Sequence, residues 1–326
     1  MEIRRMTKLV TVFGASGFIG RHVVRELCKR GQRVRAAVRH PMEANFLNPM
    51  GAVGQVQIFQ ANVRYRTSVA DALAGADAAV NLVGILAPVA KNTFEGVQSL
   101  GSRNVAQEAA RIGIEDFIHV SAIGANPESE SVYARTKAEG EKAALDLVPT
   151  ATIIRPSIVF GPQDDFFNRF AAMARVAPAL PLIGGGKTKF QPVYVDDVAD
   201  AIVKLIETGA GRGDTFELGG PEVMSFKELL QLMLRIVGRS RLLLPLPFPV
   251  ASLMGSVGDT VSHVPFVQAP ITEDQVKLLK TDNVVSATNV KTFADLGIMP
   301  ETMEAVLPSY LFRYRKQGQF SPEVPV

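Results

Sequence analysis

Short runs of β-branched and apolar residues alternate along the first half of the chain with stretches whose apolar residues recur at helical spacing. The runs predict buried parallel strands, and they lie at residues 9–13, 34–38, 56–63, 78–83, 117–120 and 152–159. The segments between them, such as 94–112 and 133–147, predict amphipathic helices. Because strands alternate with helices, the pattern predicts an α/β fold with a Rossmann-like, doubly wound parallel sheet.

The pattern changes after residue 160, where prolines and a run of three glycines interrupt it. We therefore predict a nucleotide-binding domain at residues 1–160 and a smaller C-terminal substrate-type region at 161–326. A strand predicted at 190–195 and the segment that follows, to about residue 220, are expected to return to the first domain.

The longest uncharged stretch covers residues 242–258, and its three prolines would break a membrane-spanning helix. One interpretation is a pair of helices packed on the second domain. The other is an interfacial element that meets lipid headgroups or a membrane-bound partner. The apolar side chains concerned are Leu242, Leu243, Leu244, Phe248, Leu253 and Met254. No signal peptide or transmembrane helix is predicted.

The composition narrows the function classes. The 326 residues carry a net charge of +3, with no basic run interleaved with aromatic residues, which argues against nucleic-acid binding. The one cysteine, Cys28, is consistent with a reducing compartment. The four histidines are scattered without metal-ligand spacing, so we expect no metal site.

Three glycines follow the first predicted strand at intervals of three, and a helix follows them. Gly14 permits a sharp turn, Gly17 lets the backbone approach a pyrophosphate, and Gly20 allows the helix to pack closely on the strand. The free N–H groups and the dipole of the helix would then hold the diphosphate. The pattern predicts a dinucleotide-binding turn.

The second predicted strand ends in Arg39, and no Asp or Glu occurs between Glu26 and Glu43. An acidic residue near this point binds the ribose 2′-hydroxyl of NAD, whereas an arginine pairs with the 2′-phosphate of NADP. We therefore predict NADP(H) in preference to NAD(H), the alternative being a solvated arginine at a strand end.

A second chemical pattern is the pair Tyr133 and Lys137, which lie on one face of a predicted helix at i and i+4. A free phenol has a pKa of about 10, too high for efficient proton transfer at neutral pH. We expect the lysine ammonium and a nicotinamide cation to lower the pKa of Tyr133. Ser121, at the end of the fifth predicted strand, can supply a hydroxyl to the same site.

The chain resembles the short-chain dehydrogenase/reductase superfamily in its extended or atypical branch, on the motifs Gly14-x-x-Gly17-x-x-Gly20, Ser121, Tyr133-x-x-x-Lys137 and the segments 155–162 and 193–199. A narrower resemblance links segments 81–85, 119–125, 137–142, 160–168 and 216–221 to the NAD(P)H-binding accessory subunit of respiratory complex I. That family implies a tightly held NADPH with a structural or assembly role.

The resemblance also implies which residues contact the cofactor. They come from the glycine turn, from the ends of strands three to six and from the tyrosine–lysine pair: Ser16, Phe18, Ile19, Asn62, Val63, Leu82, Val83, Gly84, Ser121, Tyr133, Lys137, Pro156 and Ile158. It implies other complex I subunits as partners, in a bacterial form on the cytoplasmic side of the inner membrane, with peripheral membrane contact through 242–258.

Whether the chain is an enzyme stays open. Active extended members carry a further hydroxyl close after the strand-five serine, but here Ala122, Ile123 and Gly124 follow. The retained Ser121, Tyr133 and Lys137 favour the alternative, an NADP-dependent reductase or a nucleoside-sugar epimerase or dehydratase.

Overall fold

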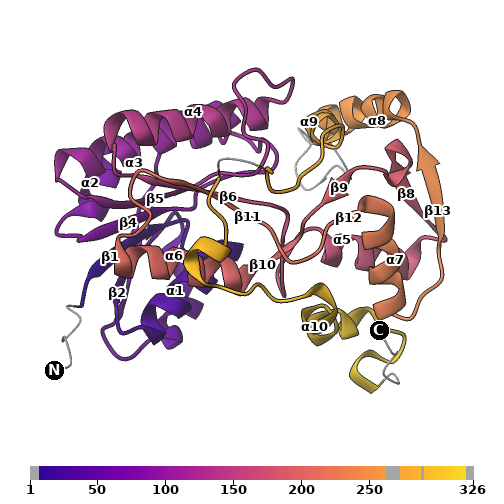
Figure 1. Ribbon diagram of the computed structural model, residues 1–326, viewed down its shortest axis with the longest axis horizontal. Helices are drawn as coiled ribbons and strands as arrows, with labels where there is room; N and C mark the ends of the chain where they lie inside the picture. Colours follow the sequence, from indigo (N-terminus) through magenta and orange to yellow (C-terminus); the bar gives the residue numbers. More distant parts are fainter. Residues whose placement is uncertain (1–6, 262–271, 288–289, 321–326) are drawn as a thin grey trace.

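The computed structural model describes residues 7–261, 272–287 and 290–320 (Figure 1). Its centre is a seven-stranded, wholly parallel sheet with the order β11-β6-β5-β4-β1-β2-β3. The strands are β1 (Leu9–Phe13), β2 (Arg33–Val38), β3 (Val56–Gln60), β4 (Ala78–Asn81), β5 (Asp116–Val120), β6 (Thr152–Pro156) and β11 (Thr215–Leu218). The predicted doubly wound α/β fold is confirmed.

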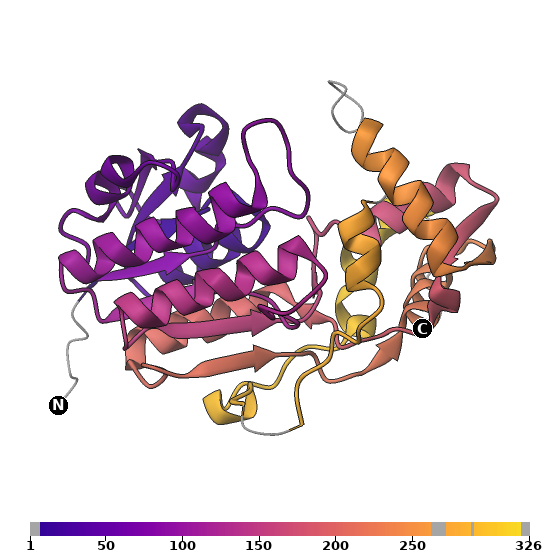
Figure 2. The ribbon, with the colours of Figure 1, turned by 90° about the horizontal axis from the view of Figure 1, so that it is seen from above.

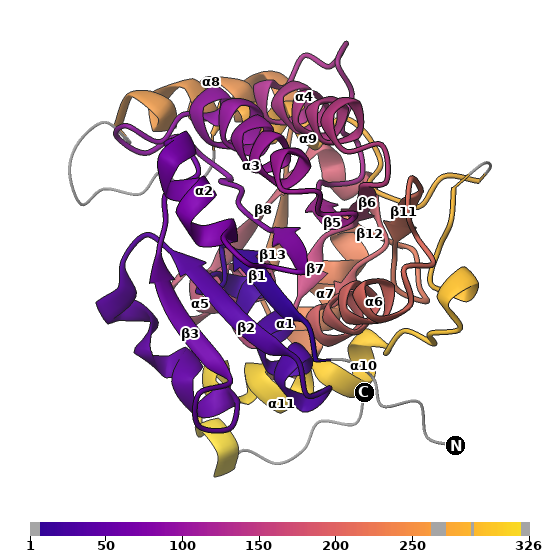
Figure 3. The ribbon, with the colours of Figure 1, turned by 90° about the vertical axis from the view of Figure 1, so that its left-hand side faces the viewer.

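Helices cover both faces of this sheet (Figure 3). On one face lie α1 (Phe18–Lys29) and α6 (Val195–Thr208), which pack against each other. On the other lie α2 (Arg66–Leu73), α3 (Leu100–Arg111) and α4 (Val132–Leu147). Each layer encloses its own apolar core, because the sheet residues alternate between the two faces.

The smaller C-terminal part lies beside the sheet domain along the long axis of the molecule (Figure 2). Its strands pair as β7 with β10, β8 with β13 and β9 with β12. They cover β7 (Val159–Phe160), β8 (Ala179–Ile183), β9 (Lys189–Phe190), β10 (Val193–Tyr194), β12 (Met224–Ser225) and β13 (Leu242–Leu246). The helices are α5 (Phe167–Val176), α7 (Phe226–Ile236), α8 (Phe248–Val261), α9 (Glu273–Leu278), α10 (Met303–Val306) and α11 (Pro308–Leu311). Short 3-10 or π turns cover Pro41–Met50, Glu95–Ser99, Gly184–Gly186, Ala294–Leu296, Phe312–Tyr314 and Gly318–Phe320.

Local chemistry explains where several helices begin. The Ser131 hydroxyl accepts from the Ala134 N–H at 3.2 Å and caps α4. Ser225 and Glu228 form a reciprocal capping box at the start of α7.

Several predicted boundaries are wrong. The strand predicted at 56–63 ends at Gln60, and the run 152–159 divides into β6 and β7 at Ser157, whose N–H pairs with the Leu218 carbonyl. The helix predicted at 94–112 is confirmed, with a π-helical segment at Glu95–Ser99 that continues directly into α3. Residues 190–195 form short strands outside the main sheet, and the segment that returns to the sheet is β11.

The apolar run 242–258 is not the predicted helix pair. Because Pro245 and Pro247 disfavour helix before residue 248, the run forms strand β13 and then enters α8, whose first turn tolerates Pro249. The exposed side chains in it include Leu242, Leu244, Leu253 and Met254. Across the described ranges, no helix combines the length and apolar character needed to span a membrane.

Candidate dinucleotide-binding site

The glycine turn joins β1 to α1 at the carboxyl edge of the sheet. Gly14 has φ +80°, and a β-carbon there would lie 3.3 Å from the backbone of Leu82. A β-carbon at Gly20 would overlap the carbonyl oxygen of Gly14, so only glycine permits this approach of helix to strand. Gly17 is the N-cap of α1 and carries no side-chain cap, which leaves the first N–H groups of the helix available to a ligand.

The structure adds Arg21 to this turn. Its guanidinium donates to the carbonyl oxygens of Ser16 at 3.0 Å and Gly17 at 3.2 Å, and it lies 4.7 Å from the centre of the Phe46 ring. Burial lowers the pKa of Arg21 from its ordinary value. Arg21 fixes the outer side of the turn, and the glycine spacing gave no signal for it.

The ends of β2 and β3 place two further predicted residues on the same edge. Arg39 directly follows β2 and is exposed, and within the described chain no carboxylate pairs with it. The Asn62 side-chain oxygen accepts from the backbone N–H of Arg64 at 3.2 Å and from its side-chain Nε at 3.3 Å. The Val63 carbonyl accepts from Asn104 at 2.8 Å. Asn62 thus already has partners for its oxygen.

The ends of β4 and β5 meet at Lys137, whose buried amine donates to the Val120 carbonyl at 3.1 Å. A β-carbon at Gly84 would stand 3.1 Å from the same nitrogen. Burial lowers the pKa of Lys137 to about 8, against an opposing effect of Glu141. The hydroxyl of Ser121 is buried and has no hydrogen-bond partner among the residues that the structure describes, so a polar group is left to satisfy at this edge of the sheet.

Tyr133 lies one turn before Lys137, with its ring 6.0 Å from the lysine amine and edge-on to Phe94. Burial, and then the carboxylate of Asp274, raise the pKa of Tyr133 to about 12. The expectation of a lowered phenol pKa is therefore wrong for the chain by itself. Burial disfavours the phenolate, and a carboxylate from a distant segment adds to the effect.

At the end of β6, Pro156 and Ile158 flank Ser157. The Ile158 N–H donates to the side-chain oxygen of Asn283 at 3.0 Å, and the Ser157 hydroxyl donates to it at 2.7 Å. Local sequence gave no signal for Asn283, because it lies more than 120 residues later in the chain.

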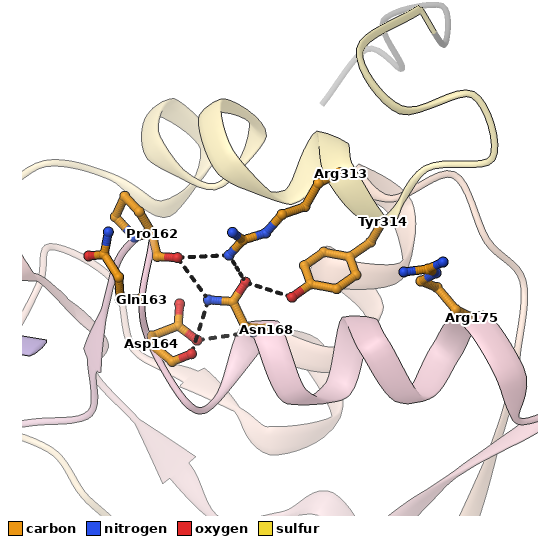
Figure 4. Close-up of a pocket in the computed structure, with 7 residues that line it drawn as sticks. All are labelled: Pro162, Gln163, Asp164, Asn168, Arg175, Arg313 and Tyr314. Atoms are coloured by element: carbon orange, nitrogen blue, oxygen red, sulfur yellow. Dashed lines mark hydrogen bonds between the residues drawn. The ribbon is translucent and has the colours of Figure 1, made fainter. Parts of the chain in front are cut away.

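A surface hollow of about 520 Å³ lies away from this cleft (Figure 4). It is lined by Pro162, Gln163, Asp164, Asn168, Arg175, Arg313 and Tyr314. One of its two arginines, Arg313, donates to the Pro162 carbonyl at 2.7 Å. These residues hold the C-terminal segment against α5, and none of them is among the predicted site residues.

Taken together, the parallel sheet, the glycine turn and the Tyr133–Lys137 helix define a dinucleotide-binding protein of the extended short-chain dehydrogenase/reductase type. The model of the NAD dependent epimerase/dehydratase family matches residues 10–219, and the chain belongs to this family.

Within it, the chain is similar to subunits of respiratory complex I. It is 37% identical over 321 residues to NADH dehydrogenase [ubiquinone] 1 alpha subcomplex subunit 9, mitochondrial, of Arabidopsis thaliana, covering 95% of this chain and 79% of that one. The Mus musculus subunit of the same name is 34% identical, with 97% and 83% covered. Among solved structures, a UDP-glucose 4-epimerase from Thermotoga maritima superposes with a TM-score of 0.68 at 20% identity, over 95% of this chain and 99% of that one.

Proposed function

We propose that this protein is a bacterial accessory subunit of respiratory complex I that holds NADP(H) without turning it over. The observation that carries the proposal is the 37% identity to a complex I subunit across 95% of the chain. A family relationship alone would also suit a working epimerase, but the likeness to complex I subunits extends through the C-terminal part, beyond residue 219 where the family match ends.

The residues of the cleft fit a dinucleotide. The turn at Gly14–Gly20 leaves helix N–H groups for the diphosphate, and Gly84 leaves room beside Lys137 that a larger residue would fill. The unpartnered hydroxyl of buried Ser121 adds a polar contact at the nicotinamide end. The lysine and serine would hold the ribose and nicotinamide there, and the bound cofactor would supply hydride chemistry if a substrate were present.

Arg39 supports NADP(H) over NAD(H). Its guanidinium is exposed after β2 with no ion-pair partner among the described residues, so it is available to a 2′-phosphate. No Asp or Glu occurs between Glu26 and Glu43, so the end of β2 carries no acidic residue that would bind the ribose 2′-hydroxyl of NAD.

Holding without turnover is supported by the environment of Tyr133. In the chain without a cofactor, burial and the carboxylate of Asp274 raise the pKa of Tyr133 to about 12, which is poorly matched to proton transfer near neutral pH. Binding a cofactor only in the folded state stabilises a protein by mass action, which gives such a site a purpose without chemistry. The retained Ser121, Tyr133 and Lys137 favour the second candidate, an NADP-dependent reductase or nucleoside-sugar epimerase.

The partners in this proposal are other complex I subunits and the surface of the inner membrane on its cytoplasmic side. The exposed part of the run 242–258 supports a peripheral contact: Leu242 and Leu253 are each 68% exposed, and Met254 is 48% exposed. Leu253 and Met254 are adjacent in α8, and their exposed apolar side chains would suit such a contact.

The test is a native gel of mildly solubilised membranes, stained for NADH dehydrogenase activity and probed for this chain. Co-migration with the large active band is the expected result. A free species of low mass would contradict the subunit assignment and favour the reductase or epimerase, for which a carbonyl-substrate screen with NADPH is the next measurement.

A further inference from the structure

The C-terminal strap, which we define as residues 272–283, connects the smaller C-terminal part to the dinucleotide cleft. It contains α9, which packs beside the start of α4 (Figure 1). Gln275 of the strap donates to the Leu86 carbonyl at 3.4 Å, in the loop after β4. Lys280 pairs with Glu130, before α4, at 3.4 Å. The strap therefore contacts the loops after β4 and β5.

Asp274 makes the closest of these contacts. Its carboxylate accepts from the Ser131 hydroxyl at 2.7 Å, the Val132 N–H at 2.7 Å and the Tyr133 N–H at 3.3 Å. The first N–H groups of a helix have no partner within the helix, and a negative charge is favourable there. Asp274 thus fixes the helix turn that carries Tyr133 and leads to Lys137.

Asn283, at the other end of the strap, contacts the segments that follow β5 and β6. Besides accepting from Ser157 and Ile158, its side-chain nitrogen donates to the Ile123 carbonyl at 3.1 Å. One amide therefore bridges the backbone after β5 and the backbone after β6. Both segments carry residues predicted to contact the cofactor, so Asn283 holds together two parts of the predicted site.

We propose that Asp274 and Asn283 are positioning residues of the dinucleotide site, and that release of the cofactor requires their contacts to open. The proposal rests on the proposed function, in which the site holds a dinucleotide. Asp274 holds the start of α4 in place, and Asn283 holds the backbone at Ile123 and Ile158 in place. Neither residue needs to touch the cofactor for this effect.

The chemistry of the two contacts makes them suited to this role. Hydrogen bonds that involve a charged acceptor are stronger than neutral ones, so the Asp274 contacts hold the α4 start firmly while the strap is docked. Both residues belong to one short segment that lies outside the seven-stranded sheet, so their contacts can break without unfolding that sheet.

The experiment measures how fast NADPH leaves the full-length protein. Protein loaded with NADPH is mixed with excess NADP⁺, and the loss of bound-NADPH fluorescence is followed for the wild type, Asp274→Ala, Asn283→Ala and Glu273→Gln. Glu273 lies on α9 beside Asp274 but pairs with Lys277 at 3.0 Å, so Glu273→Gln is the matched control. We expect release about tenfold faster in each of the first two variants and unchanged in the control.

The thermal midpoint of each cofactor-free variant separates positioning from simple stability. A lower midpoint with an unchanged release rate would show a structural role only and overturn the proposal. If Asp274→Ala does not fold, the release rate of NADPH from Asn283→Ala is the test. A rate equal to that of the wild type overturns the proposal. A wild-type protein that retains no dinucleotide would overturn the proposed function as well, which distinguishes the two failures.

Discussion

The amine of Lys137 lies against Gly84 so closely that a β-carbon at residue 84 would stand 3.1 Å from it. The same amine donates to the carbonyl of Val120 at 3.1 Å. One buried cation therefore joins the segments that follow β4 and β5, next to the boundary of β1 and β4 where the order of strands in the sheet reverses. In open α/β sheets, ligands bind at this position.

The close approach predicts the effect of Gly84→Ala. The added methyl group displaces the lysine amine, so we expect the dissociation constant for NADPH to rise about tenfold. The stability should change by less than about 1 kcal/mol, because the displaced atom is the end of a flexible side chain. Isothermal titration calorimetry and urea unfolding measure the two quantities.

Gly31→Ala is the control for this substitution. Gly31 has φ +76° and open space around it, so alanine there costs about 1 kcal/mol of stability through backbone strain. Its cofactor affinity should equal that of the wild type. Equal affinities in Gly84→Ala and the wild type would contradict the placement of the cofactor beside Lys137.

Substitutions of Tyr133 and Lys137 distinguish a protein that only holds its cofactor from one that catalyses a reaction with it. If the site only holds the cofactor, Tyr133→Phe raises the dissociation constant for NADPH by less than about tenfold, because it removes at most one hydrogen bond between uncharged groups. Lys137→Met should weaken binding more than about tenfold, since it removes a buried cation. A substrate turned over by the wild type and not by Tyr133→Phe would contradict the holding role.

The order of sheet elements and the glycine turn could be predicted because their signals are local. The run 9–13 is buried along most of its length, and the glycines follow it at a spacing that only close helix packing requires. The positions of Tyr133 and Lys137 on one helix followed from the same kind of local periodicity. Boundaries such as Gln60 and Ser157 depend on sheet register, which the chain pattern does not contain.

The electrostatics of the cleft could not be predicted, because they depend on contacts distant in sequence. The prediction for Tyr133 considered Lys137, four residues away, and omitted both burial and Asp274, which is 141 residues away. Arg21 and Asn283 were missed for a similar reason. Each fixes backbone carbonyl or N–H groups, and no residue type at a set spacing indicates that role.

Arg39→Ala tests the preference for NADP(H). Loss of a charge-assisted contact to the 2′-phosphate should raise the dissociation constant for NADPH about tenfold or more and leave that for NADH unchanged. Arg33→Ala is the matched control, because Arg33 is an exposed arginine at the opposite end of the same strand. Equal losses for the two cofactors would remove the 2′-phosphate assignment.

The pKa of Asp197 predicts a pH-dependent stability. Burial, and the neighbouring carboxylates of Glu301, Asp196 and Asp200, raise the pKa of Asp197 to about 6, although the Glu301 N–H opposes the effect. The pKa of an aspartate in the unfolded chain is about 3.9, so the folded state binds this proton more tightly than the unfolded state does. This contribution is complete below about pH 4 and is lost as the pH rises through about 6.

The free energy of unfolding of Asp197→Asn should therefore exceed that of the wild type by about 2 kcal/mol at pH 7 and differ little from it at pH 4. The asparagine oxygen can still accept from the Glu301 N–H, which Asp197 binds at 2.8 Å. Urea unfolding between pH 4 and pH 7 measures the difference. Asp146→Asn, at an exposed residue paired with Lys142, should give parallel curves with the wild type.

The exposed apolar residues of β13 and α8 predict a membrane or subunit contact that a charge would disrupt. Leu253 is 68% exposed, so aspartate can replace it without entering the core. Leu253→Asp should lower the fraction of the chain that sediments with membranes, because burying a carboxylate at an apolar interface is costly. The urea midpoint should stay that of the wild type.

Val53→Asp is the control, since Val53 is fully exposed and lies between the 3-10 turn Pro41–Met50 and β3, in the other domain. Its sedimentation should match the wild type. Sedimentation of Leu253→Asp at the wild-type level, with the fold intact, would show that the apolar surface of α8 does not carry the attachment. Loss of sedimentation in both variants would instead indicate a general effect of negative charge on membrane association.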